Sequence, residues 1–170
     1  MTEQWLPVVG YEGLYEVSDH GRVRSLERQV PNGEGTVRTV RSRILKSGNT
    51  SAGRPLVQLW KDGKGTGKHP YWLVLEAFVG PRPEGMQACH WDDNPHNNKL
   101  ENLRWGTPSE NWMDMVRNGN HVQARKTRCP QGHKYTPENT YRQPSKPNSR
   151  VCRTCRRDND RKRNRSRQPN

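Results

Sequence analysis

The sequence predicts a small modular protein of the α+β class. Only 28% of its 170 residues are hydrophobic, and its aromatic residues are six Trp and five Tyr against one Phe, which favours several small cores built around amphipathic rings. Short strand patterns fill the first third of the chain, a pattern of strand, loop, strand and helix follows, and pairs of Cys and His residues lie near the end. These observations predict a string of modules.

Changes in composition along the chain suggest four segments. Residues 1–62 are expected to form a β-rich module, and residues 68–120 a mixed unit with two strands and two helices. Residues 121–156 are expected to hold a zinc ribbon, and residues 157–170 to form a basic tail.

The charge of the chain indicates a polyanionic partner. Thirty Lys and Arg residues against seventeen Asp and Glu residues give a formal net charge of +13 and an isoelectric point near 10.1. Double-stranded DNA is the leading candidate. An anionic membrane surface is the competing polyanion, but the sequence has no basic amphipathic helix and no run of about 18 apolar residues. A membrane partner is therefore not expected.

The start of the chain and its cysteines bear on the compartment. The first residues, MTEQWLPVVG, lack the basic and apolar regions of a secretory signal, so a reducing, cytoplasmic compartment is expected. Four Cys residues in such a compartment indicate metal ligands before disulfides.

Three short strands are predicted in the first sixty residues. Residues 14–17 and 22–26 read as a pair joined by a turn at 18–21, and a third strand follows at 55–60. Alternation along the second strand places its arginines on one face, which suits a groove of DNA. The side chains of this segment expected to contact DNA are Arg22, Arg24, Arg41 and Arg43.

Residues 61–68 carry three glycines and superficially resemble a phosphate-binding P-loop. That loop needs four residues between its glycines and a Ser or Thr after the Lys. Here Gly63 and Gly67 enclose three residues, and His69 follows Lys68. The segment is therefore interpreted as a flexible turn.

The central segment begins with a predicted helix over residues 71–79, whose apolar residues fit one helical face. Residues 86–91 read as a strand and residues 92–99 as a polar loop. Residues 103–106 then read as a returning strand.

A second helix is predicted from residue 108 to about Asn118. Thr107 as N-cap, Pro108 at the first helical position and Glu110 at the third form the pattern of a capping box. Gly119 is expected to close the helix.

The stretch CHWDDNPHNNKLENLRWGTPSEN resembles the HNH endonuclease family, specifically its ββα-metal branch of homing endonucleases. Nine positions carry the resemblance. They are His90, Asp92, Asn98, Asn102, Leu103, Trp105, Thr107, Glu110 and Asn111. The resemblance implies that residues 68–120 form a ββα-metal domain and that the chain is a metal-dependent DNA endonuclease.

The resemblance also implies roles for three residues. His90 would be the general base that takes a proton from the attacking water, which suits an imidazole titrating near neutral pH. Asn111 would bind Mg²⁺ or another divalent cation, and Asn102 would pin the loop and orient the imidazole through a backbone hydrogen bond. The products would carry 5′-phosphate and 3′-hydroxyl ends.

Two positions depart from the family pattern. Relatives with the clearest metal chemistry place an acidic residue or a His where this chain has Cys89, a soft ligand poorly matched to Mg²⁺. Cys89 is kept as a candidate ligand of a softer ion. Asp93 stands where a Gly is usual in that turn.

Two alternatives stay open for the function of the chain and for Cys89: a catalytically inactive, zinc-containing DNA-binding protein, and a structural zinc site formed by Cys89 with His90.

The other polar residues of this stretch have ordinary structural interpretations. Asp92, Asn94 and Asn98 are more typical of tight turns than of metal ligands, because short polar side chains bond their own backbone. His96 is expected to be exposed to solvent, and Trp105 to pack in the core.

The last third of the chain holds a candidate zinc site. Cys129 pairs with His133 and Cys152 with Cys155, and such short spacings place both members of a pair on one turn. A Cys₃His zinc ribbon is predicted, in which Zn²⁺ supplies the folding energy that a polar segment lacks. The alternative is a set of free surface thiols beside a chance His, although an exposed pair of this spacing is reactive. Similar ribbons follow HNH modules in relatives, so the resemblance supports zinc.

A run of basic residues follows the zinc ligands. Such runs are often solvated tails, but beside a nuclease and a zinc module this one is interpreted as an arm or helix that contacts phosphates. The side chains expected to contact DNA are Arg157, Arg161, Lys162 and Arg163.

The front segment is similar to a nuclease-associated modular domain that precedes HNH motifs in homing endonucleases of phages and mobile introns. The match is carried by Trp5, Tyr11-Glu12-Gly13, Tyr15-Glu16-Val17-Ser18 and Gly21-Arg22-Val23. It implies a DNA-binding role for this segment, a monomeric protein and, for a phage-encoded chain, the cytoplasm of the host cell.

Overall fold

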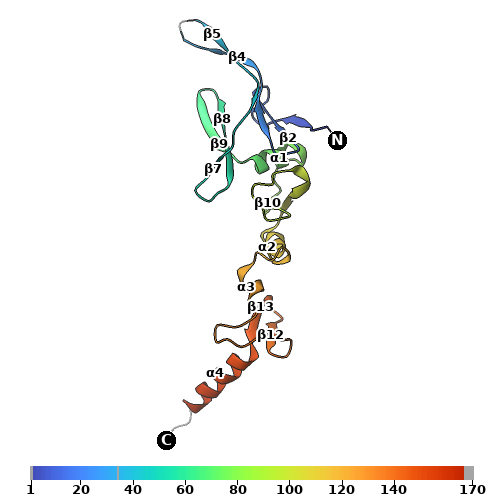
Figure 1. The fold of residues 1–170 in the computed structure, drawn as a ribbon, viewed down its shortest axis with the longest axis vertical. Helices are drawn as coiled ribbons and strands as arrows, with labels where there is room; N and C mark the ends of the chain where they lie inside the picture. Colours follow the sequence, from blue (N-terminus) through green and yellow to red (C-terminus); the bar gives the residue numbers. More distant parts are fainter. Residues whose placement is uncertain (1, 34, 167–170) are drawn as a thin grey trace. The chain divides into compact units, whose positions relative to one another are not determined.

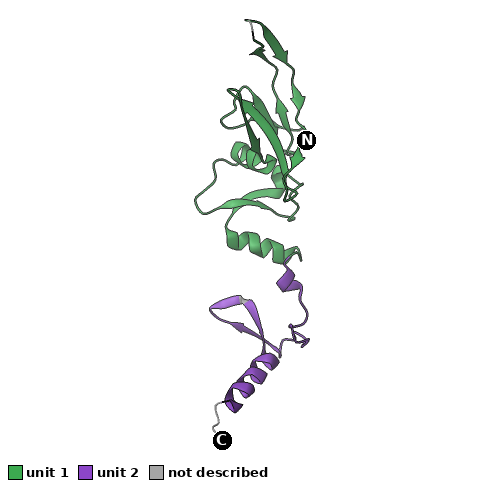
Figure 2. Ribbon diagram, turned by 90° about the vertical axis from the view of Figure 1, so that its left-hand side faces the viewer, with its two compact units in different colours: residues 1–120 green, residues 121–170 purple. Residues whose placement is uncertain are grey.

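The computed structural model describes residues 2–33 and 35–166 and divides into two compact units. Unit 1 comprises Met1–Asn120 and unit 2 comprises His121–Asn170. Figure 1 labels the helices and strands, and Figure 2 colours the two units. The fold is of the predicted α+β class, with the strands concentrated in the N-terminal segment and the Cys and His residues clustered in unit 2.

Unit 1 begins with a four-stranded antiparallel sheet. Its strands are β1 (Trp5–Pro7), β2 (Tyr15–Ser18), β3 (Val23–Ser25) and β6 (Arg43–Ile44), in the order β1-β2-β3-β6. The strands predicted at 14–17 and 22–26 are confirmed to within a residue at each end. Gly21 closes the turn between them with a φ of 79°, a left-handed conformation that favours glycine.

Two further sheets follow before helix α1 (Pro70–Phe78). A hairpin joins β4 (Arg28–Pro31) to β5 (Val37–Val40), and three strands follow in the order β7-β8-β9. Their bounds are β7 (Gly48–Asn49), β8 (Pro55–Lys61) and β9 (Lys64–Lys68). The strand predicted at 55–60 is confirmed as β8.

The interpretation of residues 61–68 as a flexible turn is wrong. Only Asp62 and Gly63, with φ values of 51° and 72°, form the turn, and residues 64–68 are strand β9 paired with β8. A two-residue turn with both φ values positive matches the twist of a β-hairpin. Trp60 lies opposite Gly65, where an added Cβ would approach the indole ring to 3.0 Å, so the glycine makes room for the ring.

Helix α1 (Pro70–Phe78) lies at the centre of unit 1, beside strands of both of its segments (Figure 1). Proline at the first position supports its start, and the His69 ring nitrogen Nδ1 lies 2.7 Å from the carbonyl oxygen of Pro55. The helix is buried on more than the single predicted face, because Leu73 is buried as well as Val74 and Leu75.

One hydrophobic core serves the whole of unit 1. Its residues come from residues 1–62, from α1 and from the central segment that follows α1. The buried members are Val8, Tyr15, Val17, Val23, Val57, Leu59, Tyr71, Leu73, Val74, Leu75 and Leu103. The expectation of separate small cores is therefore wrong for unit 1, because the strands of residues 1–62 and the central segment bury their apolar faces against the same helix.

The predicted strand, loop, strand and helix of the central segment are confirmed. Strand β10 (Gln87–His90) pairs antiparallel with β11 (Leu103–Gly106), and His90 lies opposite Leu103. A 3₁₀ turn, η1 (Leu100–Asn102), closes the loop between them. Helix α2 (Pro108–Arg117) follows directly.

Local chemistry fixes the start of α2. The Thr107 hydroxyl accepts from the Glu110 backbone N–H at 3.2 Å, and a Glu110 carboxylate oxygen accepts from the Thr107 backbone N–H at 2.7 Å. This is the predicted capping box, and Asn118 and Gly119 end the helix as expected.

A buried carboxylate holds α2 against the hairpin. Asp114 is 2% exposed and accepts at Oδ2 from both terminal nitrogens of Arg104, at 2.9 and 2.7 Å. Its other oxygen accepts from Arg117 at 2.7 Å. Both guanidinium groups also lie over the ring of Trp91, so one acidic side chain organises two cations and an indole.

As far as Ser166, where the described residues end, unit 2 contains two helices and one hairpin. They are α3 (Val122–Arg125), β12 (Thr140–Gln143), β13 (Lys146–Cys152) and α4 (Arg153–Arg165). The predicted basic tail, residues 157–170, lies within α4 as far as Arg165, and residues 167–170 are outside the described residues. The tail therefore continues a helix that begins among the cysteines.

No helix in the described residues combines the length and the apolar composition that a membrane span requires.

Truncation of one α1 valine should test whether unit 1 shares one core. Val74→Ala removes methyl groups from a side chain that is fully buried, so it should lower the free energy of unfolding by about 2 kcal/mol. Urea unfolding followed by tryptophan fluorescence measures the change. Val79→Ala, the same substitution at a position that is 55% exposed, is the control and should change stability by less than about 0.5 kcal/mol. Equal effects of the two substitutions would contradict the shared core.

Candidate active site and candidate metal centre

A cavity of about 550 Å³ lies beside the end of β10, between α1, α2 and the loop that precedes β8. Its lining brings together His90 and Asn111, which the sequence predicted to act together. Arg54, Tyr71, Asp93 and Asn120 line the same cavity. The three elements of the central segment therefore place a basic nitrogen, an amide and a carboxylate around one space.

His90 is held in a defined orientation at the last position of β10. The residue is 7% exposed, its ring Nε2 lies 3.1 Å from Oδ1 of Asn98, and the Tyr71 ring meets it edge on, with centroids 5.3 Å apart. Burial lowers the pKa of His90, and this effect is partly opposed by the hydrogen bond that the ring donates to Asn98 and by the nearby Asp92. The lowered pKa favours the neutral form of the imidazole, which can accept a proton.

Asn98 has a role that the sequence interpretation missed. It was expected to be a turn former, but it is 7% exposed and is the side-chain partner of the His90 ring. A carboxamide oxygen can only accept, so the bonded Nε2 carries the hydrogen and Nδ1 keeps its lone pair. Only the tertiary position distinguishes Asn98 from its neighbour Asn97, because both are asparagines in a polar loop.

Asn102 pins the loop but does not contact the imidazole. Its Oδ1 accepts from the backbone N–H of Asp92 at 3.2 Å, and its Nδ2 donates to Asp92 Oδ1 at 2.9 Å and to the carbonyl of Asn97 at 2.8 Å. The loop-pinning part of the expectation agrees with these contacts. The backbone carbonyl of Asn102 also accepts from the N–H of Trp91 at 2.9 Å, directly after the histidine, while Asn98 makes the direct bond to the ring. The expected role of Asn102 in orienting the imidazole through the backbone stays a prediction.

The remaining loop residues behave as turn formers. Asp92 Oδ1 accepts from the backbone N–H of Asn94 at 2.8 Å, and Asn94 Oδ1 accepts from that of His96 at 3.1 Å. His96 is exposed, as expected. These local hydrogen bonds from backbone N–H groups to side-chain oxygens fix the shape of the loop.

Asn111 projects from the first turns of α2 toward the cavity. Within the residues that the structure describes, its carboxamide makes no side-chain hydrogen bond, so its oxygen is available to a ligand. Asp93 lines the same cavity and gives one oxygen to Nδ2 of Asn120, at 3.1 Å. The φ of Asp93 is 57°, a left-handed conformation that favours glycine, which explains why a glycine is usual at position 93. Two hard oxygen donors thus face one space.

Cys89 lies away from this cavity and is not among its lining residues. The residue is 1% exposed, its Sγ lies 3.6 Å from the carbonyl oxygen of Gln87, and a Cβ on Gly106 would approach that sulfur to 3.0 Å. Burial raises the pKa of Cys89, so the buried environment favours the neutral thiol. The geometry therefore gives no support to Cys89 as a ligand, alone or with His90.

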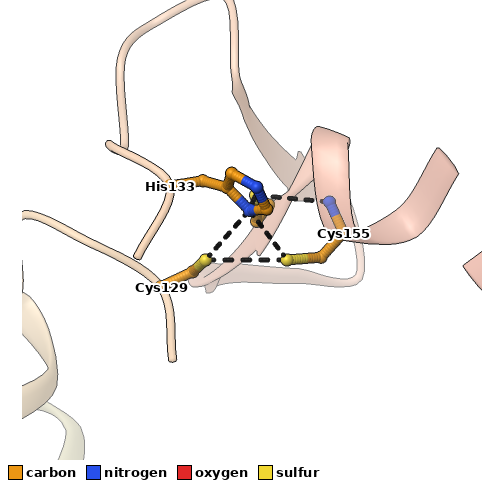
Figure 3. A group of neighbouring side chains, drawn as sticks. Cys129, His133 and Cys155 are labelled. Carbon is orange, nitrogen blue, oxygen red and sulfur yellow. Dashed lines mark hydrogen bonds between the residues drawn. The ribbon is translucent and has the colours of Figure 1, made fainter. Parts of the chain in front are cut away.

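Three Cys residues and one His of unit 2 form a compact cluster. One donor atom from each of Cys129, His133, Cys152 and Cys155 lies within 4.8 Å of all the others. Figure 3 shows the His133 ring and the sulfurs of Cys129 and Cys155 facing one another. Two tight pieces of chain supply the donors, the turn at residues 129–133 and the junction of β13 with α4.

The donor separations fit a tetrahedral zinc ion. The Cys129 sulfur lies 3.6 Å from that of Cys155 and 3.5 Å from Nδ1 of His133, and His133 Nδ1 lies 3.2 Å from the Cys155 sulfur and 3.8 Å from the Cys152 sulfur. Bonds of about 2.3 Å to sulfur and 2.0 Å to nitrogen imply edges of roughly 3.5 to 3.8 Å. The cluster can therefore close around a metal with only small movements.

The acidities of the thiols also favour a cation. The backbone N–H of Cys155 donates to Cys152 and lowers the pKa of that thiol to about 6. Burial and the neighbouring thiols raise the pKa of Cys155 to about 12. The Cys152 thiolate forms readily, whereas ionisation of Cys155 is unfavourable beside it. A divalent cation bound between the sulfurs would offset this repulsion.

Asn139 joins the two parts of the cluster and was not predicted. Its Nδ2 donates to the carbonyl of Lys134 at 2.7 Å and lies 3.4 Å from the Cys152 sulfur. Its Oδ1 accepts from the backbone N–H and the hydroxyl of Thr154, at 3.0 and 2.8 Å. Such outer contacts orient metal ligands.

Two of the four front arginines expected to contact DNA are paired within the chain. Arg22 donates to Glu3 and Arg24 donates to Glu16, with Nε to oxygen distances of 2.8 and 2.7 Å. Both guanidinium groups also lie over the Trp5 ring. Their hydrogen-bonding groups are therefore already engaged.

A basic groove lies on another part of the front segment. It has a volume of about 780 Å³ and is lined by Arg43, as expected, and by Arg28, Arg38 and Lys46. Trp60, which is 54% exposed, adds an aromatic face. A ring among cations is typical of a nucleic-acid interface. Arg41 is exposed but does not line this groove.

The four basic residues predicted in the tail are all exposed and lie on α4. They are Arg157, Arg161, Lys162 and Arg163. Arg163 pairs with Asp160 at 3.2 Å on the surface, and such an exposed pair costs little to open. The helix therefore presents cations to solvent.

Comparison with known proteins agrees with this geometry. Residues 3–60 match the NUMOD4 motif, and residues 72–113 match the HNH endonuclease family. The DNA endonuclease I-HmuI of Bacillus phage SP01 is 33% identical over 116 residues, which cover 68% of this chain and 59% of that protein. A solved structure of DNA binding and cleavage by the HNH homing endonuclease I-HmuI superposes with a TM-score of 0.56 and 31% identity, covering 72% of this chain and 63% of that one.

The chain resembles HNH homing endonucleases. Two shorter matches are also phage proteins: Protein 7.7 of Escherichia phage T7 is 37% identical over 60 residues, 35% of this chain and 45% of that protein. Protein 3.8 of the same phage is 48% identical over 42 residues, 25% of this chain and 35% of that protein. The matches thus span between about one third and three fifths of the length of these curated relatives.

Proposed function

We propose that the chain is a metal-dependent DNA endonuclease of the HNH homing type. The observation that carries the proposal is the single cavity lined by both His90 and Asn111, in a segment that matches the HNH endonuclease family. The likeness to the DNA endonuclease I-HmuI over 68% of the chain supports DNA as the substrate.

In this proposal His90 is the general base. Its Nε2–H donates to Asn98, which leaves the Nδ1 lone pair to accept a proton from water. Because the ring is fixed by Asn98 and Tyr71, the proton acceptor is oriented before the substrate binds. Attack of that water on a phosphodiester would release a 3′-hydroxyl and leave a 5′-phosphate.

The residues around the cavity fit a hard divalent cation. Asn111 would supply its amide oxygen, and the carboxylate of Asp93 lines the same space. Oxygen donors of this kind suit Mg²⁺ better than a thiol does. When bound, such a cation would stabilise negative charge on the phosphate and on the leaving oxygen.

The DNA duplex is proposed to contact the basic groove of the front segment and the exposed cations of α4. Contacts of Lys and Arg with phosphates give affinity without sequence information and weaken as salt rises. Because its relatives are phage proteins, the chain is proposed to act in the cytoplasm of the host cell.

The cluster in unit 2 is proposed to bind one structural Zn²⁺. Four protein donors complete a tetrahedral shell and leave no open position, which is typical of structural rather than catalytic zinc. The ion would tie the turn at residues 129–133 to the start of α4.

One observation favours a second function, that of a catalytically inactive DNA-binding protein. Where relatives are expected to carry an acidic residue or a His, this chain buries the protonated thiol of Cys89. Cleavage therefore depends on the donors around the cavity, and the experiment below separates the two functions.

Nicking of supercoiled plasmid DNA in the presence of Mg²⁺ tests the endonuclease. His90→Ala should reduce the cleavage rate by about 10² to 10⁴-fold, because it removes the general base. His96→Ala, at an exposed position of the same loop, is the control and should cleave at the wild-type rate. Tight DNA binding without cleavage under any divalent metal would support the inactive protein instead.

The pH dependence of cleavage should show the effect of burial on His90. Because burial lowers the pKa of this group, the neutral, proton-accepting imidazole persists to lower pH than in a free histidine. The plot of kcat/KM against pH should keep its plateau as the pH falls through about 6.5 and decline only below it. An acid limb centred above that value would contradict the assignment.

Metal analysis of purified protein should find one zinc ion per chain. Cys155→Ser should abolish zinc binding and unfold unit 2, because zinc provides its folding energy. Cys89→Ser is the matched control and should retain the full zinc content, since Cys89 lies outside the cluster. Two zinc ions per chain, one of them lost in Cys89→Ser, would restore the structural site at Cys89 and His90.

A further inference from the structure

We propose that the turn between β2 and β3 is part of the catalytic scaffold: Gly21 holds Asn98 in place, and Asn98 holds the His90 imidazole in its Nε2–H tautomer. This inference rests on the proposed endonuclease function and extends it to the front segment. Asn98 and Gly21 are positioning residues, because they act through His90.

The first contact fixes the ring. Asn98 Oδ1 lies 3.1 Å from His90 Nε2, and both residues are 7% exposed, so water does not compete freely for either group. The oxygen can only accept, which selects the tautomer with hydrogen on Nε2. Without that acceptor the neutral ring divides between two tautomers, and only one has its lone pair on Nδ1.

The second contact fixes Asn98. A Cβ added at Gly21 would lie 2.6 Å from both the Cβ and the carbonyl oxygen of Asn98, so the two backbones touch where only glycine fits. Nearby, the backbone N–H of Leu100 donates to the carbonyl of Asp19 at 2.7 Å. The loop that carries Asn98 therefore packs directly against the β2–β3 turn.

The turn itself is rigid enough to act as a support. Ser18 is fully buried, and its backbone and side chain bond both sides of the turn: its carbonyl accepts from Gly21 at 2.9 Å and its hydroxyl accepts from Arg22 at 3.1 Å. Asp19 Oδ1 also accepts from the backbone N–H of Gln4 at 3.0 Å. Because these bonds hold the turn, a displacement of Gly21 would move Asn98 rather than be taken up by the turn itself.

The charged groups around His90 do not replace this support. Asp92 and Asp93 on the following loop and Arg54 from the front segment face the imidazole electrostatically. Among the described residues, the hydrogen-bond partner of the ring is Asn98, which accepts from Nε2–H. Those charges affect how readily the ring binds a proton, whereas Asn98 determines which nitrogen carries it.

Nitrogen-15 NMR of the histidine side chains in the zinc-loaded full chain tests the first contact without any cleavage assay. At a pH where His90 is neutral, its ring should show the Nε2–H pattern, with the signal assigned by its loss in His90→Gln. Asn98→Ala should convert it to a mixture of tautomers, and the nearly isosteric Asn98→Asp should restore the Nε2–H form. A wild-type Nδ1–H pattern, or an unchanged pattern in Asn98→Ala, would overturn the proposal.

Two glycine variants test the second contact. Gly21 and Gly13 have similar φ values, 79° and 73°, so alanine brings similar backbone strain to each, but a Cβ at Gly13 meets no atom within 4 Å. Gly21→Ala should lower kcat by about 10²-fold, with DNA affinity within twofold of wild type, and should give the mixed tautomer pattern. Gly13→Ala should change neither quantity.

The two readouts separate the possible failures. If Gly21→Ala matches Gly13→Ala in both kcat and tautomer, the support from the front segment is disproved while the nuclease stands. If the wild-type chain cleaves no DNA, the proposed function fails, and the NMR pattern of Gly21→Ala still decides whether this turn positions the ring through Asn98.

Discussion

The burial of α1 is the constraint on which unit 1 depends. The nine-residue helix α1 contacts β2 and β8 of the N-terminal segment and β10 and β11 of the central segment. Residues 3–60 and 72–113, which match different family models, therefore share one hydrophobic core. Tyr71 shows the result, since it belongs to the core and also meets the His90 ring. The packing that stabilises the fold therefore also sets the wall of the cavity, and a change in either segment reaches the other.

Three carboxamides do much of the positioning in the candidate active site. Asn98, Asn102 and Asn111 respectively orient the ring, pin the loop and face the cavity. Carboxamides suit this work because they bond with directional preference and add no charge next to a base. Acidic residues have other tasks: Asp114 clamps α2 to the hairpin, and Asp92 organises the loop. Burial outweighs the nearby Asp92 and Asp93 and lowers the pKa of His90.

Much of this arrangement was predictable because the signals are local. The capping box of α2 and the spacing of the zinc ligands each lie within a few residues, and both were found where expected. The contact of Gly21 with Asn98 joins segments far apart in the chain, so no local pattern marks it. Strand β9 was missed because KGTGK has low strand propensity and is ordered only by pairing with β8. The internal pairs of Arg22 and Arg24 likewise depend on tertiary position.

Cys152 ends β13 and caps α4, so a single residue stands at the origin of the basic helix. The Cys152 sulfur accepts from the backbone N–H of Cys155 in the first turn of that helix, at 3.5 Å. In the proposed zinc site, metal binding and helix initiation would therefore depend on the same sulfur, and oxidation or alkylation of that sulfur would disturb both.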